Sequence, residues 1–111
     1  MTNTQQGVSN MSIKYIAITK EYRDTDNGNS YFSTRIEDVP QDKMYILPFQ
    51  YGYGTQSEYN SKRVLKSMDP TVTRDQIEFI KINNCNKTEV EIHGQGDSNN
   101  FNKELRYYYQ D

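Results

Sequence analysis

His93 and Cys85 are the two residues of the chain whose side chains most readily act as nucleophiles, bases or metal ligands. The sequence has no other histidine or cysteine. A structural zinc site needs four such ligands, and a nucleophilic pair needs a third group that orients the base. Neither requirement is met by the pattern. We therefore expect a neutral surface histidine, no catalytic residue, no metal site and no cofactor.

The segment Asp24-Thr-Asp26-Asn27-Gly28 has the residue types of a calcium-binding loop. Its glycine falls one position early, and Arg35 stands where the loop would need a closing glutamate. Asp and Asn are also common in tight turns, because their side chains hydrogen-bond their own backbone. We interpret this segment as a turn. The remaining carboxylates alternate with Lys and Arg along expected strands and indicate solvated faces, with no acid and base pair.

The glycine loop Gly52-Tyr-Gly54 directly precedes an expected helix start at Thr55. Backbone amides and the helix dipole favour an anion at such a position. The loop lacks the Gly-Lys-Thr or Gly-Lys-Ser of a Walker sequence. The simpler interpretation is a reversal that glycine permits, which seats Tyr51 and Tyr53 against a sheet. If an anionic ligand binds anywhere, we expect it on these amides, with a tyrosine ring as a stacking face.

Three arginines are candidates to hold such an anion in a bidentate contact. Arg35 is favoured because it lies on an expected strand. Arg63 lies about two turns into the helix, roughly 12 Å from its start. The candidate ligand- or partner-binding residues are Arg35, Tyr51, Gly52, Tyr53, Gly54, Thr55, Arg63 and Arg106.

The composition favours a sheet that positions these residues. The 111-residue chain has ten Tyr and four Phe but a single alanine, Ala17. Aromatic and β-branched residues suit strands, so we expect tyrosines to complete a thin core. A thin core also suggests a homo-oligomer. A net charge of −2 argues against nucleic acid as a partner. One cysteine and no long apolar run predict a cytoplasmic location and no membrane span.

Hydrophobic alternation and turn residues predict the secondary structure. Strands are expected over residues 13–22, 30–39 and 44–49, with a hairpin at Asn27-Gly28. Thr55 and Glu58 are expected to form a capping box for a helix over residues 56–68. Strands are then expected over 76–83 and 88–92, although Thr73 and Gln76 could instead cap a short helical turn. Residues 101–109 read as a strand, with a helix within 98–110 as the alternative.

These elements predict an α+β fold in the order β-β-β-α-β-β-β, with one helix packed on a largely antiparallel sheet of about six strands. Residues 11–111 are expected to form a single domain. Residues 1–10 read as a mobile, dispensable polar tail, or natural translation starts at Met11. An outward aromatic among residues 107–109 is a candidate dimer contact, so truncating residues 106–111 is expected to lower the oligomer mass.

Part of the chain resembles a group of short tailed-phage proteins. The resemblance covers residues 12–68 and rests on Asn29-Ser-Tyr-Phe-Ser33, Leu47-Pro-Phe-Gln-Tyr-Gly-Tyr-Gly54 and Glu58-Tyr59. It implies a phage or prophage accessory protein with no enzymatic role, of a kind that often antagonises host defence. We therefore expect a non-catalytic protein that binds a host protein. The alternative is a protein that binds or sequesters a nucleotide-like anion at the glycine loop.

Overall fold

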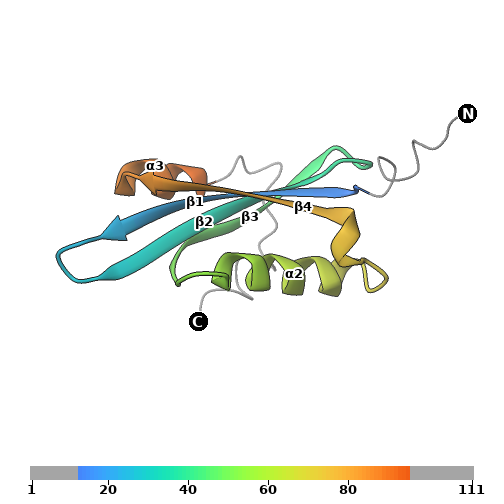
Figure 1. Cartoon of the computed structure of the whole chain (residues 1–111). Helices are drawn as coiled ribbons and strands as arrows, with labels where there is room; N and C mark the ends of the chain where they lie inside the picture. Colours follow the sequence, from blue (N-terminus) through green and yellow to red (C-terminus); the bar gives the residue numbers. More distant parts are fainter. Residues whose placement is uncertain (1–12, 96–111) are drawn as a thin grey trace, which may run out of the picture.

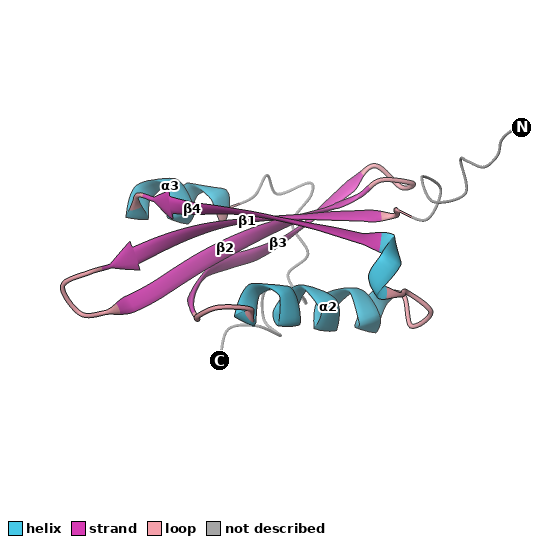
Figure 2. Cartoon of the chain, in the orientation of Figure 1, coloured by secondary structure: helices cyan, strands magenta, loops and turns pink. Residues whose placement is uncertain are grey.

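The structure, a computed structural model, describes residues 13–95, in which one sheet lies between two helices (Figure 1). The elements, coloured by type in Figure 2, are β1 (Tyr15–Asp24), β2 (Asn29–Asp38), β3 (Lys43–Tyr51), α2 (Gln56–Met68), the 3-10 turn η1 (Arg74–Gln76), β4 (Ile77–Cys85) and α3 (Lys87–His93). None of the helices within residues 13–95 has the length and apolar character that a membrane crossing requires.

The four strands form one mixed sheet in the order β3-β2-β1-β4. The β1–β2 and β2–β3 pairs are antiparallel, whereas β4 runs parallel to β1. Gly28 in the β1–β2 turn has a φ of +70°, the left-handed conformation that glycine accepts without strain. A parallel neighbour needs a crossover connection, and the segment containing α2 provides it between β3 and β4.

The expected α+β class is confirmed, together with the first three strands, the helix over residues 56–68 and the strand that follows η1. The expected strand number and order were wrong, because residues 13–95 contain four strands in a mixed sheet and a second helix. The predicted last strand over 101–109, its helical alternative, the tail 1–10 and the Met11 start lie outside the described residues.

The strand predicted over residues 88–92 is the helix α3. Its first turn is capped by Asn86, whose side-chain oxygen accepts a hydrogen bond from the Glu89 amide at 2.8 Å. Val90 is completely buried, while Ile92 is 57% exposed. Three apolar or β-branched residues at a spacing of two are too short a pattern to separate strand from helix. The asparagine cap before this segment favours the helix.

The main core lies between α2 and the sheet. It contains Tyr15, Ala17, Ile36, Leu47, Val64, Leu65, Val72 and Ile77. Tyrosines complete this core, as the composition predicts: Tyr15 is buried and donates its hydroxyl to Asp69 at 3.0 Å. Tyr45 packs against the same cluster and donates to Asp38 at 3.1 Å. Burial and the bond to Asp38 raise the pKa of Tyr45 to about 12, and burial and the bond to Asp69 raise the pKa of Tyr15.

The helix α3 lies on the other face of the sheet and is fastened mainly by polar contacts. Ser33 Oγ donates to the Val90 carbonyl at 2.7 Å, and Lys20 forms an ion pair with Glu89 at 3.2 Å. The end of the helix approaches β3 closely, since a Cβ on Gly94 would lie 2.6 Å from the Phe49 amide nitrogen. Only a glycine fits this contact without displacing backbone.

The predicted capping box at the start of α2 is absent. Thr55 makes no side-chain cap hydrogen bond, and Glu58 instead lies 3.7 Å from Arg74. The short helical turn that Thr73 and Gln76 could cap is present, and it precedes the expected strand without replacing it. Gln76 Oε1 accepts a hydrogen bond from the Thr73 amide at 3.0 Å, and this interaction starts η1 ahead of β4.

Candidate functional site

The glycine loop is a tightly anchored reversal. The Gly52 amide donates to the Ser30 carbonyl at 3.0 Å, and the Gly54 carbonyl accepts from Lys81 Nζ at 2.8 Å. A Cβ on Gly52 would lie 2.6 Å from the Phe32 ring, and Gly54 has a φ of +56°. Both glycines are therefore explained by close approach and backbone conformation.

Arg35, the arginine favoured for the glycine loop, is engaged elsewhere. Arg35 donates from Nε to the His93 carbonyl and from Nη2 to the Gln95 carbonyl, both at 2.9 Å, so its guanidinium fork holds the end of α3. Along β2, Arg35 lies four positions from Tyr31, a separation of roughly 13 Å. Tyr31 is the register partner of Tyr51, the residue before the glycine loop. Arg63 lies on α2, 5.7 Å from the centre of the Tyr59 ring. Arg106 is outside the described residues.

The remaining candidates for chemistry have structural partners. Asp24 accepts hydrogen bonds from the Asn27 side-chain amide at 2.8 Å and from the Asn27 and Asp26 backbone amides. These bonds confirm the turn and lower the pKa of Asp24, the one from the Asn27 side chain most. His93 is half-buried, in contrast to the expected surface position, and its Nε2 lies 2.8 Å from the Ile18 carbonyl. Burial lowers the pKa of His93, so its ring is neutral at pH 7. Within residues 13–95, no cluster of three or more His, Cys, Asp or Glu side chains could hold a metal ion.

The structure instead brings five aromatic rings into one continuous group, which we call the aromatic row. Tyr31 stacks on Tyr22 with ring centroids 6.2 Å apart and on Phe49 at 5.1 Å. Tyr51 meets Tyr31 edge-on at 5.8 Å and Tyr53 edge-on at 5.1 Å. The row thus spans β1, β2, β3 and the glycine loop.

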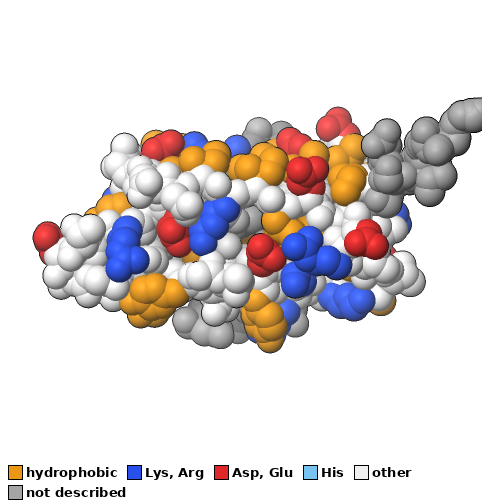
Figure 3. All heavy atoms as spheres, in the orientation of Figure 1, with side chains coloured by type: hydrophobic (Ala, Val, Ile, Leu, Met, Phe, Trp, Pro, Cys, Tyr) orange, Lys and Arg blue, Asp and Glu red, His pale blue; other side chains and the backbone are white. Residues whose placement is uncertain are grey.

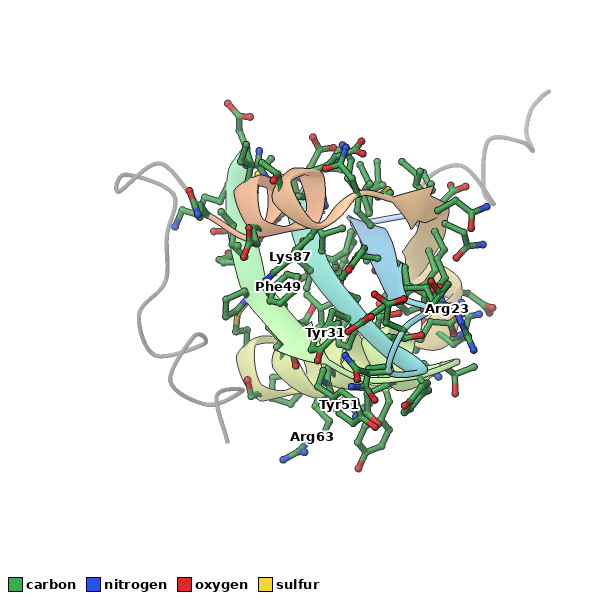
Figure 4. The ribbon with its side chains drawn as sticks, turned by 90° about the vertical axis from the view of Figure 1, so that its left-hand side faces the viewer. Arg23, Tyr31, Phe49, Tyr51, Arg63 and Lys87 are labelled. Atoms are coloured by element: carbon green, nitrogen blue, oxygen red, sulfur yellow. The ribbon has the colours of Figure 1, made fainter. Side chains whose placement is uncertain are left out.

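Strand alternation places the aromatic row on the α3 face of the sheet. Tyr31, Ser33 and Arg35 point to the same side of β2, and the last two residues bond to α3. Figure 4 looks onto this end of the molecule, where Tyr31 and Phe49 lie near the centre, with Lys87 above them and Tyr51 below. The row therefore continues the surface of this face beyond α3, towards the β1–β2 turn.

Hydrogen bonds hold the exposed end of the row in one arrangement. Tyr51 donates its hydroxyl to the Tyr53 hydroxyl at 2.9 Å, and Tyr53 donates to the Gly28 carbonyl at 3.0 Å. The rings are nevertheless open to solvent, with Tyr51 56% and Tyr53 46% exposed. The bond to Tyr53 is the main cause that raises the pKa of Tyr51, so the Tyr51 phenol is neutral near pH 7.

Two of the five residues in the row, Tyr51 and Tyr53, were among the candidates from sequence. The other three were not, although the spacing of Phe49, Tyr51 and Tyr53 by two was a signal for Phe49, because it puts the three rings on one face of an extended chain. A hairpin centred on Asn27-Gly28 would set Tyr22 opposite Ser33, whereas the observed hairpin is centred between Asp26 and Asn27 and sets Tyr22 opposite Tyr31. The sequence could supply neither this register nor that of β2 against β3, which is shifted by an irregularity between Phe32 and Thr34.

No protein-family model, curated protein or solved structure matches this chain. The class that fold and site define is therefore a small α+β domain with an aromatic surface at one end of its sheet.

Proposed function

We propose that the chain is a non-catalytic binding protein that contacts a partner protein through the aromatic row. The observation that carries this proposal is a set of contiguous rings that are fixed by their neighbours and still exposed at Tyr51 and Tyr53. Tyrosine is enriched at protein interfaces because it offers a large apolar area, a polar tip and few rotatable bonds.

Cross-strand stacking alone is a simpler explanation of aromatic residues on a sheet, because such pairs stabilise it by about 0.5–1.5 kcal/mol. It accounts for the half-buried Tyr22, Tyr31 and Phe49. It does not account for Tyr53 in the glycine loop, which extends the row beyond Tyr51 at the end of β3 with a second ring that is about half exposed. Contacts that order these rings before binding reduce the entropy that a partner must overcome.

The absence of catalysis belongs to the same proposal. The one histidine and the one cysteine have structural contacts: His93 faces the Ile18 carbonyl, and the buried Cys85 thiol lies 3.4 Å from the Ile82 carbonyl. We further propose, from the resemblance to tailed-phage proteins, that the chain is an accessory protein of phage or prophage origin. It would act in the host cytoplasm and antagonise a host defence system by binding one of its proteins.

We also propose that the chain is a homo-oligomer that pairs through β4. Among the strands of residues 13–95 it is an edge of the sheet, has neither Pro nor Gly, and exposes Ile80 and Ile82 by 40% and 43%. The opposite edge strand, β3, contains Pro48, which lacks an amide donor. Antiparallel pairing centred on Ile80 would set Phe79 against Lys81 of the second copy and avoid opposing two lysines at position 81.

Site-specific photo-crosslinking tests the role of the aromatic row in host cells. Benzoylphenylalanine replaces Tyr51 in one protein and Tyr59 in the other, since these rings are 56% and 57% exposed and only the first belongs to the row. We expect position 51 to form a covalent adduct with one defined host protein and position 59 to form none with it. Identical adducts from both positions, or none from position 51, would contradict the proposal.

A further inference from the structure

A second surface feature lies between α2 and the segment that leads into β4. It is an open pocket of about 410 Å³, a volume in the range of small-molecule sites. Four cationic side chains line it: Lys62, Arg63, Lys66 and Arg74. Figure 3 shows Lys and Arg side chains gathered over the C-terminal half of α2, with hydrophobic side chains among them.

The pocket combines an apolar floor with an aromatic wall. Val72 and Ile77 form the floor and are buried, at 4% and 5% exposed. Tyr59 forms the wall and is 57% exposed, with the Arg63 guanidinium 5.7 Å from the ring centre. This arrangement offers a flat ligand both a stacking face and apolar contact, with cations on the same side.

The charge of the pocket contrasts with that of the whole chain. The chain has a net charge of −2, yet four of its 13 Lys and Arg residues line this one feature. Two carboxylates lie nearby: Glu58 pairs with Arg74 at 3.7 Å, and Asp75 follows Arg74 in sequence. The pocket with these two carboxylates therefore has a local charge of +2, four cations less two anions.

The contacts that Lys66 and Arg74 already make leave donors for an anion. Lys66 Nζ donates to the Val72 carbonyl at 3.0 Å, which uses one of three ammonium hydrogens. Arg74 lies 4.6 Å from the centre of the Phe79 ring as well as near Glu58, and a guanidinium has five N–H donors. These contacts order the side chains around the pocket.

We propose that this pocket binds a nucleoside phosphate, with the base stacked on Tyr59 above Val72 and Ile77 and the phosphate held by Lys62, Arg63 and Lys66. Cationic donors beside an apolar, aromatic-walled hollow match the two halves of such a molecule. The site is separate from the aromatic row, so a test that refutes nucleotide binding leaves the proposed protein-binding function unaffected. The sequence predicted an anion at the glycine loop, whereas this proposal places the anion at the side of α2.

Isothermal titration calorimetry of the full chain at low salt tests this proposal with AMP, ATP, adenosine and inorganic phosphate. We expect ATP and AMP to bind, adenosine and phosphate alone to bind at least about tenfold more weakly, and affinity to fall with added salt. Single-stranded oligonucleotide is the polymer control. Tighter binding of the oligonucleotide than of ATP would overturn the assignment to a small nucleotide.

Matched variants locate the site. Arg63→Glu removes a charged contact and is expected to weaken ATP binding at least about tenfold. Tyr59→Ser removes a stacking contact and is expected to weaken ATP binding less. Lys87→Glu makes the same change of charge at an exposed position on α3 and should leave binding unchanged. The proposal is overturned if ATP fails to bind at millimolar concentration, or if Arg63→Glu and Lys87→Glu have equal effects while both proteins remain folded.

Discussion

The two faces of the sheet are covered in different ways. On one face, α2 contributes 13 residues and buries Val64 and Leu65 completely in the main core. On the other, α3 has seven residues, of which only Val90 is buried, and polar contacts from Ser33 and Arg35 hold it in place. Apolar burial supplies most of the stability of a fold. We therefore infer that the α2 face stabilises the protein, while the α3 face is free to present the aromatic row.

The largest expected effect comes from truncating the core beneath α2. Leu65→Ala should lower the free energy of unfolding by about 2–5 kcal/mol, because it removes buried methyl groups and leaves a cavity. The control, Ile92→Ala on α3, removes a side chain that is 57% exposed. It should change the free energy of unfolding by no more than about 0.5 kcal/mol. Urea unfolding measures both variants. Equal losses would contradict the difference between the two faces.

A smaller loss is expected where α3 meets β3. Gly94→Ala places a Cβ 2.6 Å from the Phe49 amide nitrogen and should cost about 1–3 kcal/mol through overpacking. Thr88→Ala, at an exposed position on the same helix, is the control and should unfold close to the wild type. Hydrogen exchange should show faster exchange of α3 amides in Gly94→Ala, with those of α2 little changed. Uniformly faster exchange would mean that α3 supports the whole fold.

The pH dependence of stability sharpens the comparison further, because the contact of His93 with the Ile18 carbonyl joins α3 to β1. Burial makes its pKa lower in the folded than in the unfolded protein, so the unfolded state binds the proton first as the pH falls. Stability should therefore decrease from about pH 6.5 downward. In His93→Gln, this decrease should vanish between pH 7 and 5 in thermal unfolding. An unchanged profile would assign the decrease to other groups.

The smallest effect on stability is expected at the open edge of β4. Ile80→Lys should leave the free energy of unfolding within about 0.5 kcal/mol, because the side chain is 40% exposed. It should nevertheless convert the oligomer to a monomer in sedimentation experiments, since it places two lysines opposite each other across the proposed pairing. Glu78→Lys, at another exposed position of the strand, is the control for a change of charge. An unchanged oligomer mass in Ile80→Lys would exclude this edge.

The sequence was informative where a local signal decides the structure. The Asn27-Gly28 turn, the alternation of β1 and β2, and the apolar stripe of α2 are of this kind, and the structure confirms them. The pairing of β4 with β1 depends on contacts distant in sequence, so a mixed sheet could not be recognised from local patterns. For the same reason Arg35 looked available to an anion, whereas tertiary packing places its guanidinium against the last carbonyls of α3.

The candidate site shows the same limit. Tyr51 and Tyr53 were singled out because the glycine loop is a visible local signal. Tyr22 and Tyr31 join them only through strand register. Phe49 joins them only because β3 pairs with β2 on both sides of a shift in register. Sequence patterns thus indicated one end of the aromatic row, and packing between strands supplied the rest.

The central claim is that the aromatic row binds a partner and contributes little to folding, and one paired measurement tests it directly. Tyr51→Ser and Tyr59→Ser remove rings of equal exposure, one from the row and one from α2. Each variant is titrated calorimetrically with the host protein that photo-crosslinking identifies. Each variant is also unfolded in urea. We predict that Tyr51→Ser abolishes binding and costs no more than about 1 kcal/mol of stability, whereas Tyr59→Ser leaves binding unchanged. Retained binding in Tyr51→Ser, or a loss of binding equal in both variants, would contradict the claim.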